Sequence, residues 1–222
     1  MTIDPHAGEP IETAGAPAAA AEAAVVLLHG RGDSPAGILR LVDEVYHHGV
    51  CYVAPAAAGR VWYPGGFTDP VDERRSAYLE SAFGQVAAAL SIAREAGVDR
   101  EQTVLAGFSQ GAAVAAEFAT RRPARYGGLA VLAGGLLGQT ATLTAREGTL
   151  DGSPASCGVG HEDPHVSPAH VEATGELLDA MGATVTVETY PELGHAIGDG
   201  EVAALDQLVA AVAGEGSPGP RR

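Results

Sequence analysis

The sequence predicts an α/β fold in which helices cover both faces of a mostly parallel central sheet. Short, continuously apolar runs rich in β-branched residues are typical of strands buried on both faces. Longer segments with apolar residues at helical spacing lie between these runs, which is the pattern of a parallel sheet. The chain has 222 residues, of which 46% are hydrophobic. These values favour a single domain over 1–222 with a sizeable core and with flexible ends at about 1–9 and 215–222.

Six apolar runs are predicted to form the central strands. In chain order they are AAVVLLHG (23–30), GVCYVAP (49–55), TVLAGF (103–108), GGLAVLAGG (127–135), ASCGVG (155–160) and ATVTVETYP (183–191). A further short strand at the edge of the sheet is predicted over PIETAG (10–15).

Five segments between these strands are predicted to be helices. A Ser-Pro pair is a typical helix start, and such pairs open the predicted helices 34–48 and 167–182. The remaining predicted helices span 72–96, 110–122 and 199–214.

The charge balance excludes some classes of partner. The chain has 28 acidic and 13 basic residues, a formal net charge of −15, and every basic residue is arginine. Such a surface repels nucleic acids and anionic membranes. Two origins of this composition stay open: adaptation to a salt-rich cytoplasm, where salt screens the self-repulsion, or a GC-rich genome that favours Arg, Ala and Gly over Lys.

The sequence has no feature that predicts export. The stretch 1–17 lacks the basic start and apolar core of a secretory signal, and no apolar run approaches the roughly 18 residues of a membrane span. Cys51 and Cys157 both lie in apolar, strand-like surroundings, which favours buried free thiols over a disulfide. We therefore expect a cytoplasmic protein.

A serine between two glycines, GFSQG (107–111), lies where a predicted buried strand passes directly into a predicted helix. The pattern G-x-S-x-G in this position is typical of a nucleophile elbow, a strained turn that exposes the serine hydroxyl at the edge of the sheet. The glycines are needed because a side chain at either place would collide with the adjoining strand and helix. Ser109 is therefore the candidate nucleophile.

A serine nucleophile needs a base, and the base needs an acid that orients it. In this architecture the chain order is serine, acid, histidine. His195 lies in a loop between the last strand and the last helix and is the candidate base, whereas His170 lies within a predicted helix and is expected at the surface. Asp163 follows the fifth central strand and precedes a proline, so it is preferred as the acid over its neighbour Glu162.

The oxyanion of an acyl-transfer reaction needs backbone N–H donors. One is expected from Gln110, the residue after the nucleophile, and the second from the loop LHGRGDS (28–34). We assign the second donor to Arg31. His29, at the start of the same loop, is expected to brace it through hydrogen bonds.

Taken together, these motifs resemble those of the phospholipase/carboxylesterase family of α/β hydrolases, which includes acyl-protein thioesterases. VVLLHGRGDS, VLAGFSQGAAVA, the D-P-H-V after the fifth strand and the G-H before the last helix match the family's motifs in order and spacing. The resemblance implies an α/β-hydrolase fold, Ser109 as nucleophile, Asp163 as acid, His195 as base, and no cofactor.

Two segments bear on the substrate. AGRVWYPGGF (58–67) is similar to a segment that lies near the site in some bacterial and archaeal members, so Trp62 and Tyr63 either line the pocket or serve as structural aromatic anchors. The stretch 135–154 is short and polar, unlike the large apolar lid that a lipase of long-chain fats needs. Small soluble esters are the expected substrates.

Other functions stay open at this point. A thioesterase or lysophospholipase would use the same residues, a hydrolase-fold binding protein would have lost activity, and a metal-dependent lactonase would use a metal. The HEDPH stretch (161–165) groups two histidines and two acids, but it lacks an evident distant ligand, so no metal site is predicted. A homodimer is compatible with the sequence.

Overall fold

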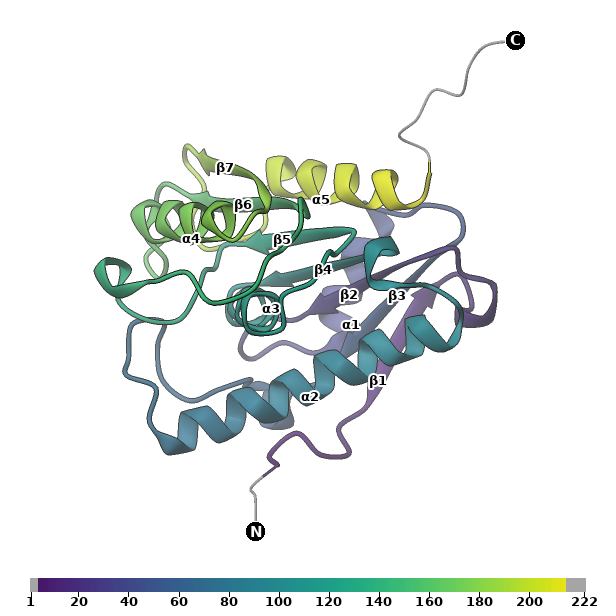
Figure 1. The fold of residues 1–222 in the computed structure, drawn as a ribbon, viewed down its shortest axis with the longest axis horizontal. Helices are drawn as coiled ribbons and strands as arrows, with labels where there is room; N and C mark the ends of the chain where they lie inside the picture. The colour runs from purple at the N-terminus through teal and green to yellow at the C-terminus, as the bar shows by residue number, and fades with distance from the viewer. Residues whose placement is uncertain (1–3, 215–222) are drawn as a thin grey trace.

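Seven strands form one sheet in the computed structural model, which describes residues 4–214 (Figure 1). The strands are β1 (Ile11–Gly15), β2 (Ala23–Leu28), β3 (Val50–Pro55), β4 (Thr103–Phe108), β5 (Gly128–Leu132), β6 (Pro154–Gly160) and β7 (Thr184–Tyr190). Their order across the sheet is β1-β3-β2-β4-β5-β6-β7. The strand β1 is antiparallel to β3, and every other pairing is parallel. The predicted strands are all present. The predicted runs 23–30 and 127–135 extend past the ends of β2 and β5 into loops.

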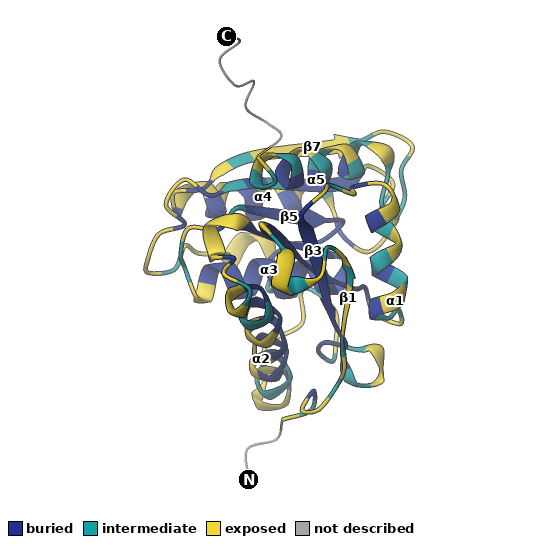
Figure 2. Cartoon of the chain, turned by 90° about the vertical axis from the view of Figure 1, so that its right-hand side faces the viewer, coloured by how far each residue is buried: buried dark blue, intermediate teal, exposed yellow. Residues whose placement is uncertain are grey.

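Helices cover both faces of the sheet, as Figures 1 and 2 show. One face is covered by α2 (Glu73–Glu95), α3 (Gln110–Arg121) and α4 (Pro168–Ala180), and the other by α1 (Pro35–Ile38) and α5 (Asp199–Val212). Within the described residues, no helix is long and apolar enough to cross a membrane. The α/β architecture predicted from the sequence is therefore confirmed.

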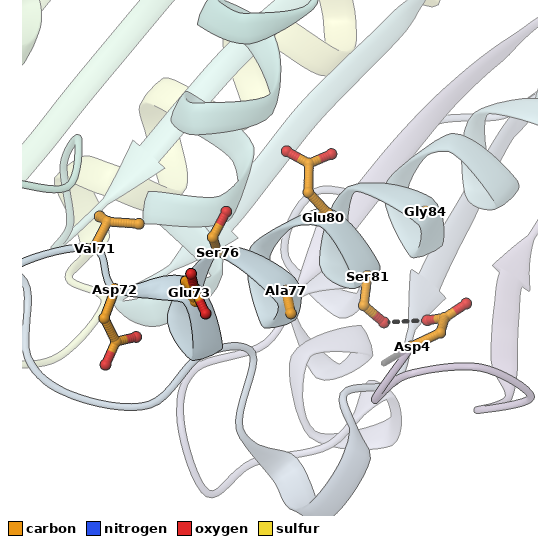
Figure 3. Close-up of a pocket in the computed structure, with 9 residues that line it drawn as sticks. All are labelled: Asp4, Val71, Asp72, Glu73, Ser76, Ala77, Glu80, Ser81 and Gly84. Carbon is orange, nitrogen blue, oxygen red and sulfur yellow. Dashed lines mark hydrogen bonds between the residues drawn. The ribbon is translucent and has the colours of Figure 1, made fainter. Parts of the chain in front are cut away.

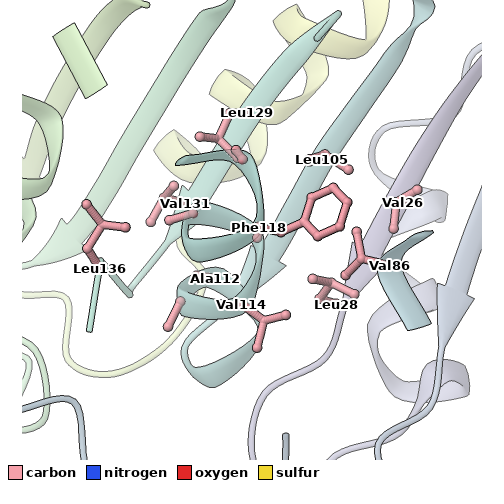
Figure 4. Close-up of a cluster of buried hydrophobic side chains, with 14 of the residues drawn as sticks. Val26, Leu28, Val86, Leu105, Ala112, Val114, Phe118, Leu129, Val131 and Leu136 are labelled. Carbon is pink, nitrogen blue, oxygen red and sulfur yellow. The ribbon is translucent and has the colours of Figure 1, made fainter. Parts of the chain in front are cut away.

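The central strands have apolar side chains on both faces. Val26 and Leu28 of β2, with Leu105 of β4, pack in the cluster under α2 and α3 (Figure 4). Val25 and Leu27 of β2 belong to the cluster on the opposite face, with α1 and α5. This alternation is the two-residue period of a strand. Because both sets are buried, the strand has a continuous apolar sequence.

The predicted helix over 34–48 is wrong in its length. Only Pro35–Ile38 is α-helical, and the chain continues as a 3-10 helix over Leu39–Asp43. The Ser-Pro start is present, since the Ser34 side chain accepts a hydrogen bond from the Gly37 N–H. Gly37 lowers the helix propensity of this first turn, and a Cβ there would lie 1.8 Å from Oδ1 of Asp33. The α-helix is therefore limited to one turn.

The start of the described chain packs against the core, so the flexible end expected over 1–9 is wrong for residues 4–9. His6 is fully buried. Its backbone N–H donates to Ser81 Oγ at 2.8 Å, and its carbonyl accepts from the Gln85 amide at 2.6 Å. Its ring donates from Nε2 to the Trp62 carbonyl at 3.0 Å and accepts the Ala58 N–H on Nδ1 at 3.0 Å. The polar composition gave no sign of these bonds. Residues 1–3 and 215–222, the rest of the predicted flexible ends, lie outside the described residues.

Candidate active site

Ser109 lies at the tight junction of β4 and α3. Its backbone has φ 53° and ψ −114°, a strained conformation for a residue with a side chain. Two glycines make the junction possible. A Cβ on Gly107 would lie 2.4 Å from the carbonyl carbon of Gly111, and a Cβ on Gly111 would lie 2.2 Å from the carbonyl oxygen of Leu28. Both glycines of the sequence pattern are therefore steric requirements.

The structure brings three of the predicted site residues into one hydrogen-bonded array. Ser109 Oγ lies 2.8 Å from Nε2 of His195, and Nδ1 of His195 lies 2.7 Å from Oδ2 of Asp163. The three side chains come from the loops after β4, β6 and β7, which all leave the carboxyl edge of the sheet. The parallel sheet thus assembles residues that are far apart in the sequence.

Asp163 is held as an acceptor. Its side chain is fully buried, and Oδ1 accepts the N–H groups of His165 at 2.8 Å and Val166 at 3.0 Å. Hydrogen bonds from N–H groups stabilise an ionised carboxylate. Glu162, the alternative acid, is exposed and takes no part in the array.

This arrangement fixes the tautomer of His195. A carboxylate only accepts hydrogen bonds, so Nδ1 of His195 is the donor and Nε2 has the lone pair that faces the Ser109 hydroxyl. The ring is held between Phe108, with centroids 5.0 Å apart, and His165, with centroids 4.8 Å apart and an edge-on geometry. The imidazole is therefore oriented to take the serine proton.

The loop after β2 is braced by His29, as the sequence predicts. His29 is fully buried. Its Nδ1 donates to the Gly30 carbonyl at 2.7 Å, and its Nε2 accepts the Ala57 N–H at 3.2 Å. Burial lowers the pKa of the His29 imidazole, so the neutral ring that this bonding pattern requires is favoured. The brace holds the segment around Arg31 beside the nucleophile.

Gln110 contributes through its side chain as well as its backbone. Its backbone N–H is the first of α3, where helix geometry provides no intrahelical acceptor. Its amide oxygen accepts the Trp62 N–H at 2.9 Å, and its amide nitrogen donates to the Tyr63 carbonyl at 2.7 Å. The Arg31 guanidinium donates to the carbonyls of Tyr63 and Gly65. The segment after β3 is therefore tied to the site from two sides.

Trp62 and Tyr63 do not line the pocket, so that prediction is wrong. Their exposed fractions are 0% and 1%, and they act as the structural anchors that were the alternative. Trp62 donates from its indole nitrogen to the His29 carbonyl at 2.8 Å, and the Arg75 guanidinium lies over the Tyr63 ring at 4.9 Å. Gly65 and Gly66, which follow, are exposed, whereas the rings of Trp62 and Tyr63 lie in the core.

A cavity of about 500 Å³ opens above the array. We call it the active-site cavity. It is lined by Arg31, Gly65, Gly66, Phe67, Phe108, Ser109, Gln110, His165 and His195. The two residues predicted as oxyanion donors, Arg31 and Gln110, therefore lie in the same cavity as the nucleophile and the base. The pocket residues that the sequence reasoning missed are Gly65, Gly66, Phe67, Phe108 and His165.

A larger hollow of about 730 Å³ lies between the N-terminal segment and α2 (Figure 3). Four carboxylates, those of Asp4, Asp72, Glu73 and Glu80, are among its lining residues. Among the described residues, neither a histidine nor an arginine belongs to that lining, so the hollow lacks the serine-histidine pairing found at Ser109.

Glu201 is a buried carboxylate near the array that sequence reasoning missed. Its exposed fraction is 1%. It accepts the Ala133 N–H at 3.0 Å and the Gly198 N–H at 3.1 Å, and so joins the end of β5 to the start of α5, just after the loop of His195. The Gly198-x-x-Glu201 spacing is a capping pattern. A Cβ on Gly158 would lie 2.7 Å from Glu201 Cγ, so this glycine makes room for the carboxylate.

We expect Glu201 to make the free energy of unfolding decrease as pH rises from about 4.5 to 7. Burial, and to a lesser extent the charge of Asp163, raises the pKa of Glu201 from 4.5 to about 7. In that range the folded state holds a proton that the unfolded state has lost, so the free energy of unfolding falls by about 3 kcal/mol. Glu201→Gln removes this titration, so the pH slope from urea unfolding should be less negative in the variant.

The control for this slope is Glu176→Gln, which removes an exposed glutamate on α4. Its slope should follow that of the unmodified protein. Parallel slopes for the unmodified protein and Glu201→Gln would contradict the assignment.

The HEDPH segment is occupied by hydrogen bonds within the site. Asp163 bonds to His195, and the His165 ring packs against that histidine. Within residues 4–214, no group of three or more His, Cys, Asp or Glu side chains is arranged to hold a metal ion.

His170 was expected at the surface, and that prediction is wrong, because the side chain is buried. Its ring finds partners inside the protein, since Nε2 donates to the Leu136 carbonyl at 2.7 Å and Nδ1 lies 3.0 Å from the Thr140 hydroxyl.

The fold and this arrangement of residues have counterparts among known proteins. The sequence model of the Phospholipase/Carboxylesterase family matches residues 10–213. The chain belongs to the phospholipase/carboxylesterase family. The resemblance drawn from the sequence motifs is thereby confirmed, and membership places the chain among hydrolases with the α/β-hydrolase fold.

Individual proteins show how similar the chain is to known sequences and structures. Esterase YpfH of Escherichia coli K12 is 29% identical over 204 residues, which cover 85% of this chain and 82% of that protein. A phospholipase/carboxylesterase from Dyadobacter fermentans has a TM-score of 0.85 at 33% identity, covering 94% of this chain and 99% of that one. Zea mays acyl-protein thioesterase 2 shares the fold, with a TM-score of 0.71 at 20% identity over 92% of this chain and 99% of that one.

Proposed function

We propose that the protein is a serine carboxylesterase that cleaves small soluble esters through an acyl-enzyme intermediate. The observation that carries the proposal is the continuous array from Ser109 Oγ through His195 to the buried Asp163, which opens into a cavity. The esterase names of similar proteins support the reaction class.

In the proposed mechanism Ser109 Oγ attacks the ester carbonyl carbon while Nε2 of His195 takes the hydroxyl proton. The C–O bond to the alcohol then breaks, and Nε2 returns that proton to the leaving oxygen. Water repeats the sequence on the acyl-enzyme, with His195 as the base, and releases the acid. Asp163 orients the ring and stabilises the imidazolium that forms twice in the cycle. These steps use side chains of the chain alone and need no cofactor.

The proposal assigns the oxyanion hole to the backbone N–H groups of Arg31 and Gln110. Support comes from their place in the active-site cavity with Ser109 and from the bonds that fix both. His29 braces the Arg31 loop, and the Gln110 side chain is fixed to the segment after β3. Donors held in this way need little reorganisation when charge develops on the carbonyl oxygen.

The preference for small soluble esters rests on size and charge. The active-site cavity has a volume of about 500 Å³, and the net charge of −15 disfavours anionic membranes and polyanionic acyl carriers. Thioesters and lysophospholipids are therefore second to neutral esters. A cytoplasmic location is part of the proposal, supported by the buried free thiols of Cys51 and Cys157.

Labelling with a fluorophosphonate tests the proposal. An activated serine displaces fluoride and forms a stable phosphonyl ester, so mass spectrometry should find one label per chain on the peptide with Ser109. Hydrolysis of p-nitrophenyl acetate should fall in proportion to labelling. Protein unfolded in urea keeps every serine but loses the array, and it should not react. A label on another residue, or hydrolysis that survives complete labelling, would exclude this mechanism.

A further inference from the structure

A second, smaller cavity of about 210 Å³ adjoins the active-site cavity. We call it the side cavity. It is lined by Phe67, Thr68, Thr140, Asp163, Pro164, His165, Val166, Ser167 and His170. Phe67 and His165 line both cavities, so the two spaces meet at these side chains. The side cavity is therefore the nearest neighbour of the active-site cavity on the His165 side.

The direction of proton transfer decides which end of the substrate faces the side cavity. In the proposed function, His195 must hand its proton from Nε2 to the oxygen of the departing alcohol. The alcohol therefore lies on the side of the substrate nearest His195. His165 packs edge-on against His195, with ring centroids 4.8 Å apart, and the side cavity begins at His165. The alcohol portion of the ester is the part that reaches it.

The side cavity offers hydrogen-bonding groups of both kinds. Nε2 of His170 donates to the Leu136 carbonyl at 2.7 Å, so Nδ1 is the acceptor, and the Thr140 hydroxyl donates to it at 3.0 Å. The Thr140 oxygen is then left with lone pairs that can accept. The Ser167 oxygen accepts the His170 backbone N–H at 3.3 Å, so its O–H can donate. Thr68 adds a further hydroxyl.

The charges around the side cavity restrict the ligand further. No lysine or arginine is among the described residues that line it, and these residues include Asp163, whose carboxylate is fully buried. A phosphate or carboxylate placed here would meet like charge without a cation to offset it. A neutral group with several hydroxyls meets donors and acceptors that match its own. The volume of about 210 Å³ limits the group to a few carbon atoms.

We propose that the side cavity is the leaving-group subsite and that it selects esters of small, neutral polyhydroxy alcohols. This inference rests on the proposed serine-esterase function, because only that mechanism places the alcohol beside His195. It goes beyond that function by naming the alcohol class that the enzyme prefers.

Four butanoate esters test the subsite because they share an acyl group and differ in the alcohol. The alcohols are 1-propanol, 2-methoxyethanol, glycerol and glycerol 3-phosphate. The glycerol ester should have a kcat/KM about 10-fold above that of the propyl ester, the value expected of two added neutral hydrogen bonds. The 2-methoxyethyl ester has an electron-withdrawing oxygen but no hydroxyl, so it should stay near the propyl ester. The phosphate ester should be slower than the glycerol ester.

Two variants assign the preference to the side cavity. In Thr68→Val and Thr140→Val the ratio of kcat/KM for the glycerol ester to that for the propyl ester should fall toward one. The control is Thr142→Val, which changes a hydroxyl that donates to the Gln139 carbonyl and lines neither cavity. Its ratio should equal that of the unmodified protein.

The outcomes separate the two proposals. If all the esters are hydrolysed at similar kcat/KM, or if both valine variants keep the full glycerol ratio, the subsite proposal is wrong while the serine-esterase proposal stands. A faster phosphate ester would also overturn the neutral-alcohol class. If no ester is hydrolysed and the fluorophosphonate leaves Ser109 unlabelled, the esterase proposal fails, and the subsite proposal falls with it.

Discussion

Ser109→Ala is expected to lower kcat for hydrolysis of p-nitrophenyl acetate by roughly a million-fold, the loss seen when a serine hydrolase loses its nucleophile. The variant keeps His195, Asp163 and the proposed oxyanion donors, so the residual rate should still exceed that in water by roughly 10³–10⁴. Initial rates at saturating ester measure the effect. The melting temperature should change little because the substitution removes one oxygen atom.

The matched control is Ser76→Ala, the same chemical change at an exposed position of α2. It should keep the rate of the unmodified protein. If kcat of Ser109→Ala falls by less than about 10-fold, another group performs the chemistry, because removal of a catalytic nucleophile lowers kcat by far more.

Gly111→Ala is expected to damage both stability and activity. The new Cβ would lie 2.2 Å from the Leu28 carbonyl oxygen and 2.6 Å from that of His29. These are backbone atoms that no side-chain rotation can move, so α3 must shift away from β2. Overpacking of this kind costs about 3 kcal/mol, which lowers the melting temperature by roughly 6–12 °C in a chain of this size. The shift also moves the Gln110 N–H, and kcat should fall at least about 100-fold.

Gly84→Ala provides the control for this steric argument. Gly84 is also inside a helix, α2, but a Cβ there would meet no atom within 4 Å. The same substitution should therefore stabilise the protein by about 0.5–1 kcal/mol. Thermal unfolding and ester hydrolysis of the two variants, measured side by side, check the prediction. A Gly111→Ala variant that retains both its melting temperature and its rate would contradict the geometry described for the elbow.

The parts of the fold predicted from the sequence are those governed by local patterns. Continuous apolar runs marked the buried strands, and G-x-S-x-G at a strand-to-helix junction marked the elbow, because the glycines there are steric requirements. Chain order and loop position were enough to select Asp163 and His195, which the structure places at hydrogen-bonding distance in one array with Ser109. Confirmation of the family supports the same pattern.

The parts that could not be predicted depend on tertiary contacts. The direction in which Trp62 and Tyr63 turn is set by partners far along the chain, His29 and Arg75. The burial of Glu201 depends on space left by Gly158 on a neighbouring strand. Neither contact has a periodicity or a spacing that a sequence pattern could reveal. The side cavity is unpredictable for the same reason, since its wall comes from three separate loop segments and from His170 of α4.

Two buried imidazoles, those of His6 and His29, make the folded state less stable at acidic pH. Nε2 of His29 and Nδ1 of His6 accept the N–H groups of the adjacent residues Ala57 and Ala58. Burial lowers the pKa of both rings below 6.5. As pH falls below that value, the unfolded chain binds more protons than the folded chain, so the free energy of unfolding decreases. Protonation of either ring would remove an acceptor from the strand end that leads to the pocket wall. Acidification therefore weakens the support of the pocket wall through two residues that do not line the active-site cavity.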